Sequence, residues 1–194
     1  MRTTRIVALV LSAFATTAVL AGCSGGDEHS TMPGTSTSAA ARADHNQADV
    51  TFARQMIPHH QQAVEMAKLV PSRTRNAQVV DLANRVQQAQ DPEIRLMTGW
   101  LTAWAAPASM GHDGHGGMPG MMAPDAMTAL GQARDADFDR RWLSMMIEHH
   151  QGAITMAEAE LRDGSNAEAK QLAQRIIDAQ RGEITTMNAL LGTS

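Results

Sequence analysis

Apolar residues recur every three or four positions along residues 52–70, with polar residues between them. This spacing marks one face of an amphipathic helix. The pattern stops at residues 71–73, which begin with a proline, and a second stripe of the same period covers residues 79–101. Neither stretch shows the alternation with a period of two that is typical of a strand. The first half of the chain therefore predicts two helices joined by a turn.

The second half of the chain repeats this arrangement at an offset of 90 residues. Residues 56–67 read MIPHHQQAVEMA and residues 146–157 read MIEHHQGAITMA. The correspondence continues without a gap from residues 49–101 to residues 139–191, well beyond the histidines. Such extended self-similarity indicates a duplicated structural unit rather than two chance motifs. It predicts a second pair of helices with a turn at residues 163–165.

Four amphipathic helices predict an all-α fold, a four-helix up-down bundle made of two duplicated αα-hairpins. Repeat 1 is expected at residues 44–105 and repeat 2 at residues 133–194, with a linker at residues 106–132. In an up-down-up-down order, both hairpin turns lie at one end of the bundle. Equivalent residues of the two repeats are then expected to meet at the same depth.

Histidines occupy stripe positions where apolar residues are expected. His59 and His149 lie on the stripes, and His60 and His150 lie about 100° round, at the stripe edges. A buried imidazole needs a partner for each nitrogen or a metal ion, and methionines bracket both pairs. Imidazole and thioether ligands together favour copper, with Cu(I) preferred over Cu(II). The alternatives are histidines in a polar core network and methionines that only fill space. The candidate ligands in the bundle are Met56, His59, His60, Met66, Met146, His149, His150 and Met156.

Two carboxylates also fall on the apolar stripes, Glu93 and Glu183. A buried carboxylate is costly unless it is paired or bound to a metal ion. Counted from the turn, His59 and Glu93 differ by roughly 9 Å along the bundle axis. The sequence therefore leaves open whether the glutamates join the histidines or form a separate polar layer. The residues considered for an outer shell are Glu93, Glu183, Met97, Met187, Asp49 and Asp139.

The linker between the repeats carries a second group of soft ligands. Its segment SMGHDGHGGMPGMM, residues 109–122, contains glycines and prolines that disfavour regular structure. Histidine and methionine without cysteine are typical of an extracytoplasmic copper-binding tract, and methionine is a poor zinc ligand. The alternative is a linker with a chance bias in composition. The candidate ligands in this tract are Met110, His112, His115, Met118, Met121 and Met122.

The N-terminus has the pattern of a secretory signal. Arg2 and Arg5 precede an apolar run that ends in Leu-Ala-Gly-Cys at residues 20–23. This ending resembles the bacterial lipobox, which implies a signal peptide at residues 1–22 and lipid attachment to Cys23. Residues 23–43 are then a flexible tether, and the mature protein is anchored to the extracytoplasmic face of the cell membrane. The alternative is an ordinary signal peptide that contains a cysteine.

Composition narrows the function classes. The formal net charge is −4, and removal of the two N-terminal arginines makes the mature chain more negative, which argues against nucleic acid as a partner. The chain has one cysteine, so no disulfide forms within it. The dinuclear sites of helical bundles use Glu-x-x-His motifs, which this sequence lacks, and it has no phosphate loop or nucleotide fingerprint. A non-enzymatic protein is expected.

The pattern D-x-x-[FW]-x-x-x-M-I-x-H-H-Q-x-A-[VI]-x-M-A occurs at residues 49–67 and again at residues 139–157. It resembles the domain of unknown function 305 family over about residues 44–192. The resemblance implies a ferritin-like four-helix bundle and a relation to periplasmic copper-binding proteins implicated in copper resistance. It also implies a metal-binding role for the His and Met residues named above.

Three functions follow from these patterns. The preferred one is a lipoprotein that binds or sequesters copper for homeostasis or resistance, without catalysis. A helical interaction or envelope-stress module with structural histidines is the alternative, and a ferritin-like redox enzyme is the third. The metal ion and the membrane are the expected partners, and the sequence leaves open whether the chain forms a homo-oligomer.

Overall fold

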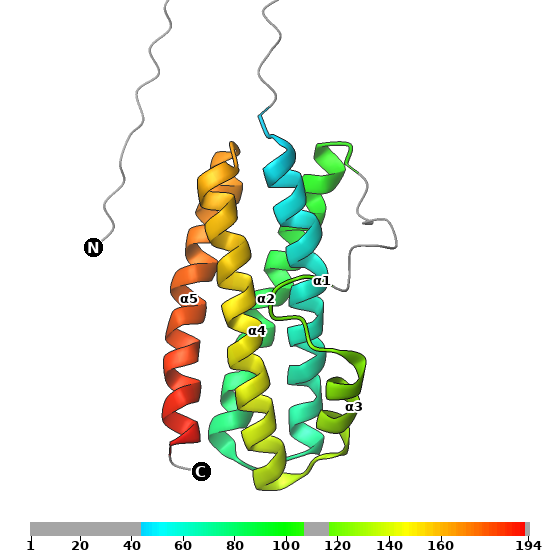
Figure 1. Cartoon of the computed structure of the whole chain (residues 1–194), viewed down its shortest axis with the longest axis vertical. Coiled ribbons are helices and arrows are strands. Elements are labelled where there is room, and N and C mark those ends of the chain that lie inside the picture. The colour runs from blue at the N-terminus through cyan, green and yellow to red at the C-terminus, as the bar shows by residue number, and fades with distance from the viewer. Residues whose placement is uncertain (1–43, 107–116, 193–194) are drawn as a thin grey trace, which may run out of the picture. The chain divides into compact units, whose positions relative to one another are not determined.

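The computed structural model describes residues 44–106 and 117–192, and these residues form an all-helical bundle (Figure 1). Two long hairpins make up the bundle, as the periodicity predicts, and the all-α fold class is confirmed. The turns fall where the stripes break, after Leu69 and after Asp163. The elements are α1 (Gln47–Leu69), the short 3-10 helix η1 (Val70–Ser72), α2 (Ala77–Ala103), α3 (Pro124–Gln132), α4 (Asp135–Asp163) and α5 (Ala167–Leu191).

Asparagine side chains start three of the four long helices. Asn46 accepts hydrogen bonds from the backbone of Ala48 and Asp49 and completes a capping box at the start of α1. Asn76 and Asn166, at equivalent positions of the two repeats, cap α2 and α5 in the same way. The duplicated sequence therefore encodes the start of each returning helix as well as its apolar face.

The two hairpin turns lie at opposite ends of the bundle, so the expected arrangement with both turns at one end is wrong. The backbone N–H of Asp135, at the start of α4, donates to Arg73 O in the α1–α2 turn at 2.8 Å. At the other end, Asn46 Nδ2 donates to Asp163 O at 2.9 Å, which places the α4–α5 turn beside the start of α1. Helices α1 and α4 are therefore antiparallel neighbours, and α2 and α4 run in the same direction (Figure 1).

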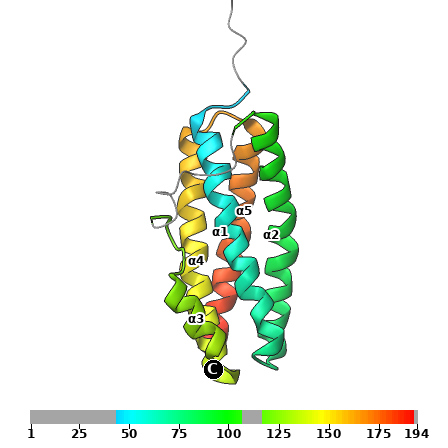
Figure 2. The same ribbon diagram turned by 90° about the vertical axis from the view of Figure 1, so that its right-hand side faces the viewer.

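The long linker explains this topology, because it carries the chain back along the bundle before α4 begins. Its last part is the helix α3, which the sequence reading did not predict. Pro124 stands at the first turn of α3, where its missing N–H costs nothing, and Leu130 is buried against the bundle. Helix α3 packs against the first half of α4 (Figure 2).

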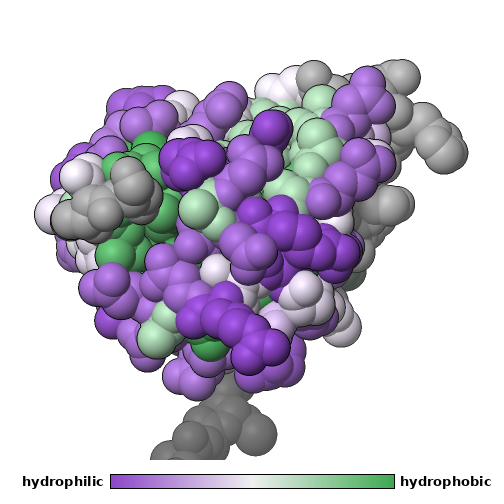
Figure 3. Space-filling model, turned by 90° about the horizontal axis from the view of Figure 1, so that it is seen from below, coloured by the Kyte–Doolittle hydropathy of each residue, from purple (hydrophilic) through white to green (hydrophobic). Residues whose placement is uncertain are grey.

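The apolar core is divided into two clusters, one toward each end of the bundle. One contains Phe138, Trp142 and Leu143 near the α1–α2 turn, and the other contains Phe52, Leu101 and Leu172 near the α4–α5 turn. At the end that carries the α1–α2 turn, polar side chains make up most of the visible surface, with apolar patches among them (Figure 3). The apolar stripes of the four long helices thus form two apolar clusters, and the histidines lie between these clusters.

Asp49 links the start of α1 to the α4–α5 turn. Its Oδ1 accepts from the backbone N–H groups of Ser165 at 3.0 Å and Asn166 at 2.9 Å. Asp49→Ala is expected to lower the free energy of unfolding by about 2 kcal/mol, because these donors at the start of α5 lose their acceptor. Urea denaturation at pH 6 measures the change.

Asp139→Ala is the matched control, since Asp139 occupies the equivalent position and accepts from Asn76 Nδ2 at 3.0 Å. This interaction involves one side-chain donor and no helix-start N–H group, so its loss is expected to cost about 1 kcal/mol. An equal loss in the two variants would show that capping of α5 by Asp49 adds nothing.

Candidate metal centre

Four histidines form a buried layer across the middle of the bundle. His59 and His60 come from the middle of α1, His149 and His150 come from the middle of α4, and each side chain is 0% exposed. The ring centroids of His59 and His149 lie 3.7 Å apart with an angle of 36° between the planes. Residues at the midpoints of two antiparallel helices meet at one depth, so this pair forms although the topology differs from the one expected.

The second histidine of each pair binds a glutamate of the same hairpin. His60 Nε2 lies 2.8 Å from Glu93 Oε2, and His150 Nε2 lies 2.6 Å from Glu183 Oε2. The sequence left open a separate glutamate layer about 9 Å away, but the side chains close that gap. Side chains lean toward the N-terminus of their own helix, so His60 and Glu93 lean toward each other across the antiparallel pair.

Hydrogen-bond partners determine which ring nitrogen is free. A carbonyl or carboxylate oxygen only accepts, so Nε2 of His59, 3.1 Å from Pro119 O, carries the proton. The same reasoning assigns Nε2–H to His60 and His150, and in a neutral ring Nδ1 then offers a lone pair. Within the described part of the chain, Nδ1 of all four histidines and Nε2 of His149 have no hydrogen-bond partner. Metal-binding histidines typically show this pattern, with the outer nitrogen donating to an oxygen.

Burial keeps His59 and His149 neutral. Desolvation, with repulsion from His60 and His150, lowers the pKa of His59 to about 3, although the bond to Pro119 opposes the shift. Desolvation and the neighbouring histidines hold the pKa of His149 well below 6.5. Both rings are therefore uncharged at neutral pH, and neither ring has to release a proton before its free nitrogen binds a metal ion.

The methionines do not converge on the histidines as the sequence suggested. Met56 and Met156 belong to one apolar cluster, and Met66 and Met146 belong to the other. Met56 and Met146 lie three residues before His59 and His149, within about one helical turn. Met66 and Met156 lie seven residues away, roughly 10 Å along the axis. The antiparallel pairing of α1 and α4 separates the sulfurs because the motif's direction is reversed between the two helices.

The linker candidates divide into two groups. Met118 and Met122 are buried, and Met121 is partly buried on the segment before α3. Met110, His112 and His115 lie outside the described residues, as does Cys23. The tract at residues 109–122 is therefore not one flexible unit, because its last residues pack on the bundle.

The other outer-shell candidates lie away from the histidine layer. Asp49 and Asp139 bind the turns at opposite ends of the bundle, and Met97 and Met187 pack in different apolar clusters. Beside Asp49 lies Glu160, a buried carboxyl that the sequence reading missed. Its position is equivalent to Val70 in repeat 1, and that mismatch of an acidic with an apolar residue was the available signal.

Sequence reasoning also missed the residues that cover the centre. Gln62 and Gly152 occupy the one differing position within HHQ-x-A, and Pro119 belongs to a linker segment that looks unstructured. Over residues 44–106 and 117–192, no three His, Cys, Asp or Glu side chains form a preformed metal cage. Two neutral imidazoles with free nitrogens, flanked by thioethers, instead suit a soft ion that needs few ligands.

Residues 49–191 match the family described as Domain of unknown function (DUF305). The chain belongs to this family. A DUF305 protein from Streptomyces coelicolor, described as secreted, is 36% identical with a TM-score of 0.71 over 75% of this chain and 93% of that one. A DUF305 fragment from Deinococcus radiodurans is 32% identical with a TM-score of 0.71, over 77% of this chain and 98% of that one. The family and its helical bundle are thereby confirmed.

Solved structures of CopM also resemble this chain. CopM in its Cu(II)-bound form is 34% identical with a TM-score of 0.64, over 75% of this chain and 96% of that one. CopM has also been solved in Cu(I)-bound and Ag-bound forms. The uncharacterized protein L153 of Acanthamoeba polyphaga mimivirus is 42% identical over 53 residues, and the match spans only 35% of its length.

No helix among the described residues is both long enough and apolar enough to cross a membrane.

Proposed function

We propose that this DUF305 protein binds copper through its central histidines and sequesters it outside the cytoplasm, without catalysis. The observation that carries the proposal is the close pair of His59 and His149, which is buried and has three nitrogens without a hydrogen-bond partner. An unpartnered buried imidazole is costly, and a bound ion removes that cost. The solved Cu(I)-bound, Cu(II)-bound and Ag-bound forms of CopM support copper as the ion.

Cu(I) is the preferred oxidation state. Nδ1 of His59 and a nitrogen of His149 are the primary ligands, and Met56 and Met146 are the nearest thioethers along the two helices. His60 and His150 form the flanking layer, where Glu93 and Glu183 hold Nε2 and leave Nδ1 toward the core. The linker residues Met110, His112 and His115 are a separate capture tract in this proposal. Lipidation at Cys23 would keep the protein on the extracytoplasmic face of the membrane.

Competition titration with Cu(I) in the mature protein tests the proposal. His59→Leu with His149→Leu is expected to weaken Cu(I) binding at least about 100-fold, since changes beyond the ligands already cost 10–100-fold. Leucine keeps the layer apolar and filled, and circular dichroism checks that the variant folds. An affinity equal to that of the parent protein would refute the bundle site.

A triple alanine variant at Met110, His112 and His115 tests the linker tract without touching residues 117–123. An unchanged number of bound ions would remove the tract from the proposal.

The second candidate function, an interaction module with structural histidines, is favoured by the His60–Glu93 and His150–Glu183 pairs, which also explain buried histidines without a metal. It predicts that replacing His59 and His149 leaves Cu(I) affinity unchanged, and that replacing His60 and His150, which form these pairs, lowers stability.

A further inference from the structure

A short segment of the linker lies across α1 and α4 at the level of the histidines. This strap, residues 117–123, precedes α3. Gln62 of α1 holds it through both amide atoms: Nε2 donates to Met122 O at 2.9 Å, and Met122 N donates to Oε1 at 2.7 Å. A paired amide contact of this kind matches a backbone donor and acceptor at once, so Gln62 attaches the strap to α1 at one defined register.

The opposite side of the strap rests directly on the backbone of α4. A Cβ added to Gly152 would lie 2.0 Å from Pro119 O, which leaves no room for any other residue there. Gly120 adopts φ +74°, a conformation that glycine accepts readily, and a Cβ on it would lie 2.7 Å from Glu148 O. Close backbone contact therefore depends on one glycine from each partner.

Gln62 and Gly152 are equivalent residues of the two repeats, 90 positions apart. Within the repeated HHQ-x-A motif, the first copy has Gln62, whose side chain binds the strap. The second copy has Gly152, which leaves space for the strap backbone. This difference breaks the symmetry of the central layer. Pro119 O binds Nε2 of His59, while neither nitrogen of His149 has a partner among the described residues.

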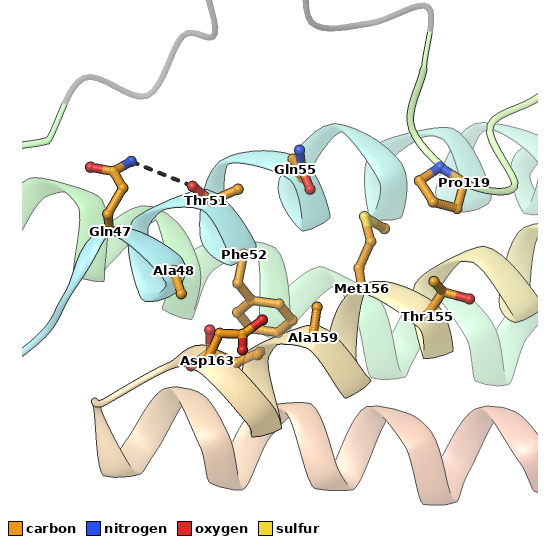
Figure 4. Close-up of a pocket in the computed structure, with 11 residues that line it drawn as sticks. Gln47, Ala48, Thr51, Phe52, Gln55, Pro119, Thr155, Met156, Ala159 and Asp163 are labelled. Atoms are coloured by element: carbon orange, nitrogen blue, oxygen red, sulfur yellow. Dashed lines mark hydrogen bonds between the residues drawn. The ribbon is translucent and has the colours of Figure 1, made fainter.

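A groove of about 380 Å³ between α1 and α4 reaches the strap from outside (Figure 4). Phe52 and Met156 line it, and Pro119 stands at one end of it. His59 and His149 are fully buried and do not line the groove. Pro119 joins the groove to the histidine layer, because it lines the groove and its carbonyl oxygen binds His59.

We propose that the strap is a cover over the metal centre and that Gln62 and Gly152 are its positioning residues. Through Pro119 O, the strap holds His59 in the tautomer whose Nδ1 is free, and it slows entry and exit of the ion. The inference rests on the proposed function, since it concerns access to the same centre. Beyond the proposed function, the inference states that binding and release of the metal ion require the hydrogen bonds between Gln62 and Met122 to break.

Two variants release the strap from opposite sides. Gln62→Ala removes the hydrogen bonds to Met122, and Gly152→Ala forces Pro119 away from α4. Gln61→Ala, at an exposed neighbouring position, and Gly182→Ala, where an added Cβ meets nothing within 4 Å, are the matched controls. In metal-free protein, both test variants are expected to exchange the Met122 amide proton at least about tenfold faster than the parent. The controls are expected to exchange at the parental rate.

Nitrogen NMR of His59 and the kinetics of Cu(I) transfer complete the test. The parent is expected to show protonated Nε2 and free Nδ1, and the test variants are expected to show a mixture of tautomers, because Pro119 O has moved. Transfer of Cu(I) to a competing chelator is expected to be about tenfold faster in both variants.

The outcomes separate this inference from the proposed function. Unchanged amide exchange, or faster exchange with an unchanged Cu(I) transfer rate, would overturn the cover while the metal centre stands. Failure of the parent protein to bind Cu(I) would overturn both, and faster exchange in that case would show that the contact between Gln62 and the strap is purely structural.

Discussion

The metal-free protein is expected to lose several kcal/mol of unfolding free energy as the pH falls from about 6.5 to about 3. His59 has a folded pKa of about 3 against an ordinary value of 6.5, and His149 is also shifted well below that value. Between these limits the unfolded chain binds protons that the folded chain refuses, so acid favours unfolding. A shift of this size in one buried residue corresponds to about 5 kcal/mol.

Urea denaturation at intervals of half a pH unit measures this dependence. His59→Leu with His149→Leu is expected to flatten the curve below pH 6.5, because the two imidazoles whose lowered pKa opposes protonation in the folded state are then absent. His45→Gln, which removes a histidine outside the central layer, is the control. A double variant whose stability falls as steeply as that of the parent would contradict the burial of these two neutral rings.

Glu160→Gln is expected to stabilise the protein above pH 8 relative to the parent. Glu160 is 1% exposed, and its pKa is raised to about 8 by desolvation, by its hydrogen bond to Asp49 and by repulsion from that carboxylate. Burial opposes ionisation of Asp49 too, but the bonds from Glu160 and from backbone N–H groups outweigh it and lower the pKa of Asp49. One proton therefore lies between two carboxyl groups, and Glu160 carries it.

The direction with pH follows from that raised pKa. Between about pH 4.5 and 8 the folded protein holds a proton on Glu160 that the unfolded chain releases, so the contribution of Glu160 to the stability of the parent falls as the pH rises. Glutamine is neutral in both states and still donates to Asp49. The two proteins should be nearly equal at pH 5 and should differ by a few kcal/mol at pH 8.5.

Thermal denaturation at pH 5 and pH 8.5 provides the measurement. Glu148→Gln removes an exposed carboxylate from the same helix and is the control. If the Glu160 variant and the parent change in parallel between the two pH values, Glu160 does not hold a proton in the folded protein. Taken with the effect of the two histidines, these shifts predict that the metal-free bundle is most stable near about pH 6.5.

Local pattern was sufficient for the four long helices and for the burial of His59 and His149. A stripe with a period near 3.6 residues identifies the buried face of a helix wherever that helix packs, so His59 and His149 could be assigned to the core directly. His60 and His150 were placed at the stripe edge, but the glutamate of the returning helix provides a partner that lets them be fully buried. A helical wheel contains no information about the side chains of the neighbouring helix.

The order of the helices in space could not be predicted from the stripes, because an apolar face does not specify the direction of its neighbour. The stripes are compatible with the two hairpin turns at one end of the bundle or at opposite ends. The linker that contains α3 returns the chain to the α1–α2 turn before α4 begins, and this places the turns at opposite ends. That choice separated Met66 from Met156 and brought Asp49 to the α4–α5 turn instead of the histidine layer.

By itself, the sequence determined the duplicated hairpins, their turns and the paired histidines on the buried face. These features depend on interactions within a few turns of helix or on a repeat that can be read directly. Only the tertiary structure decided which glutamate meets each histidine, which nitrogen remains free and how the strap lies between Gln62 and Gly152. These features depend on contacts between residues about 30 to 90 positions apart, whose geometry is set when the helices pack.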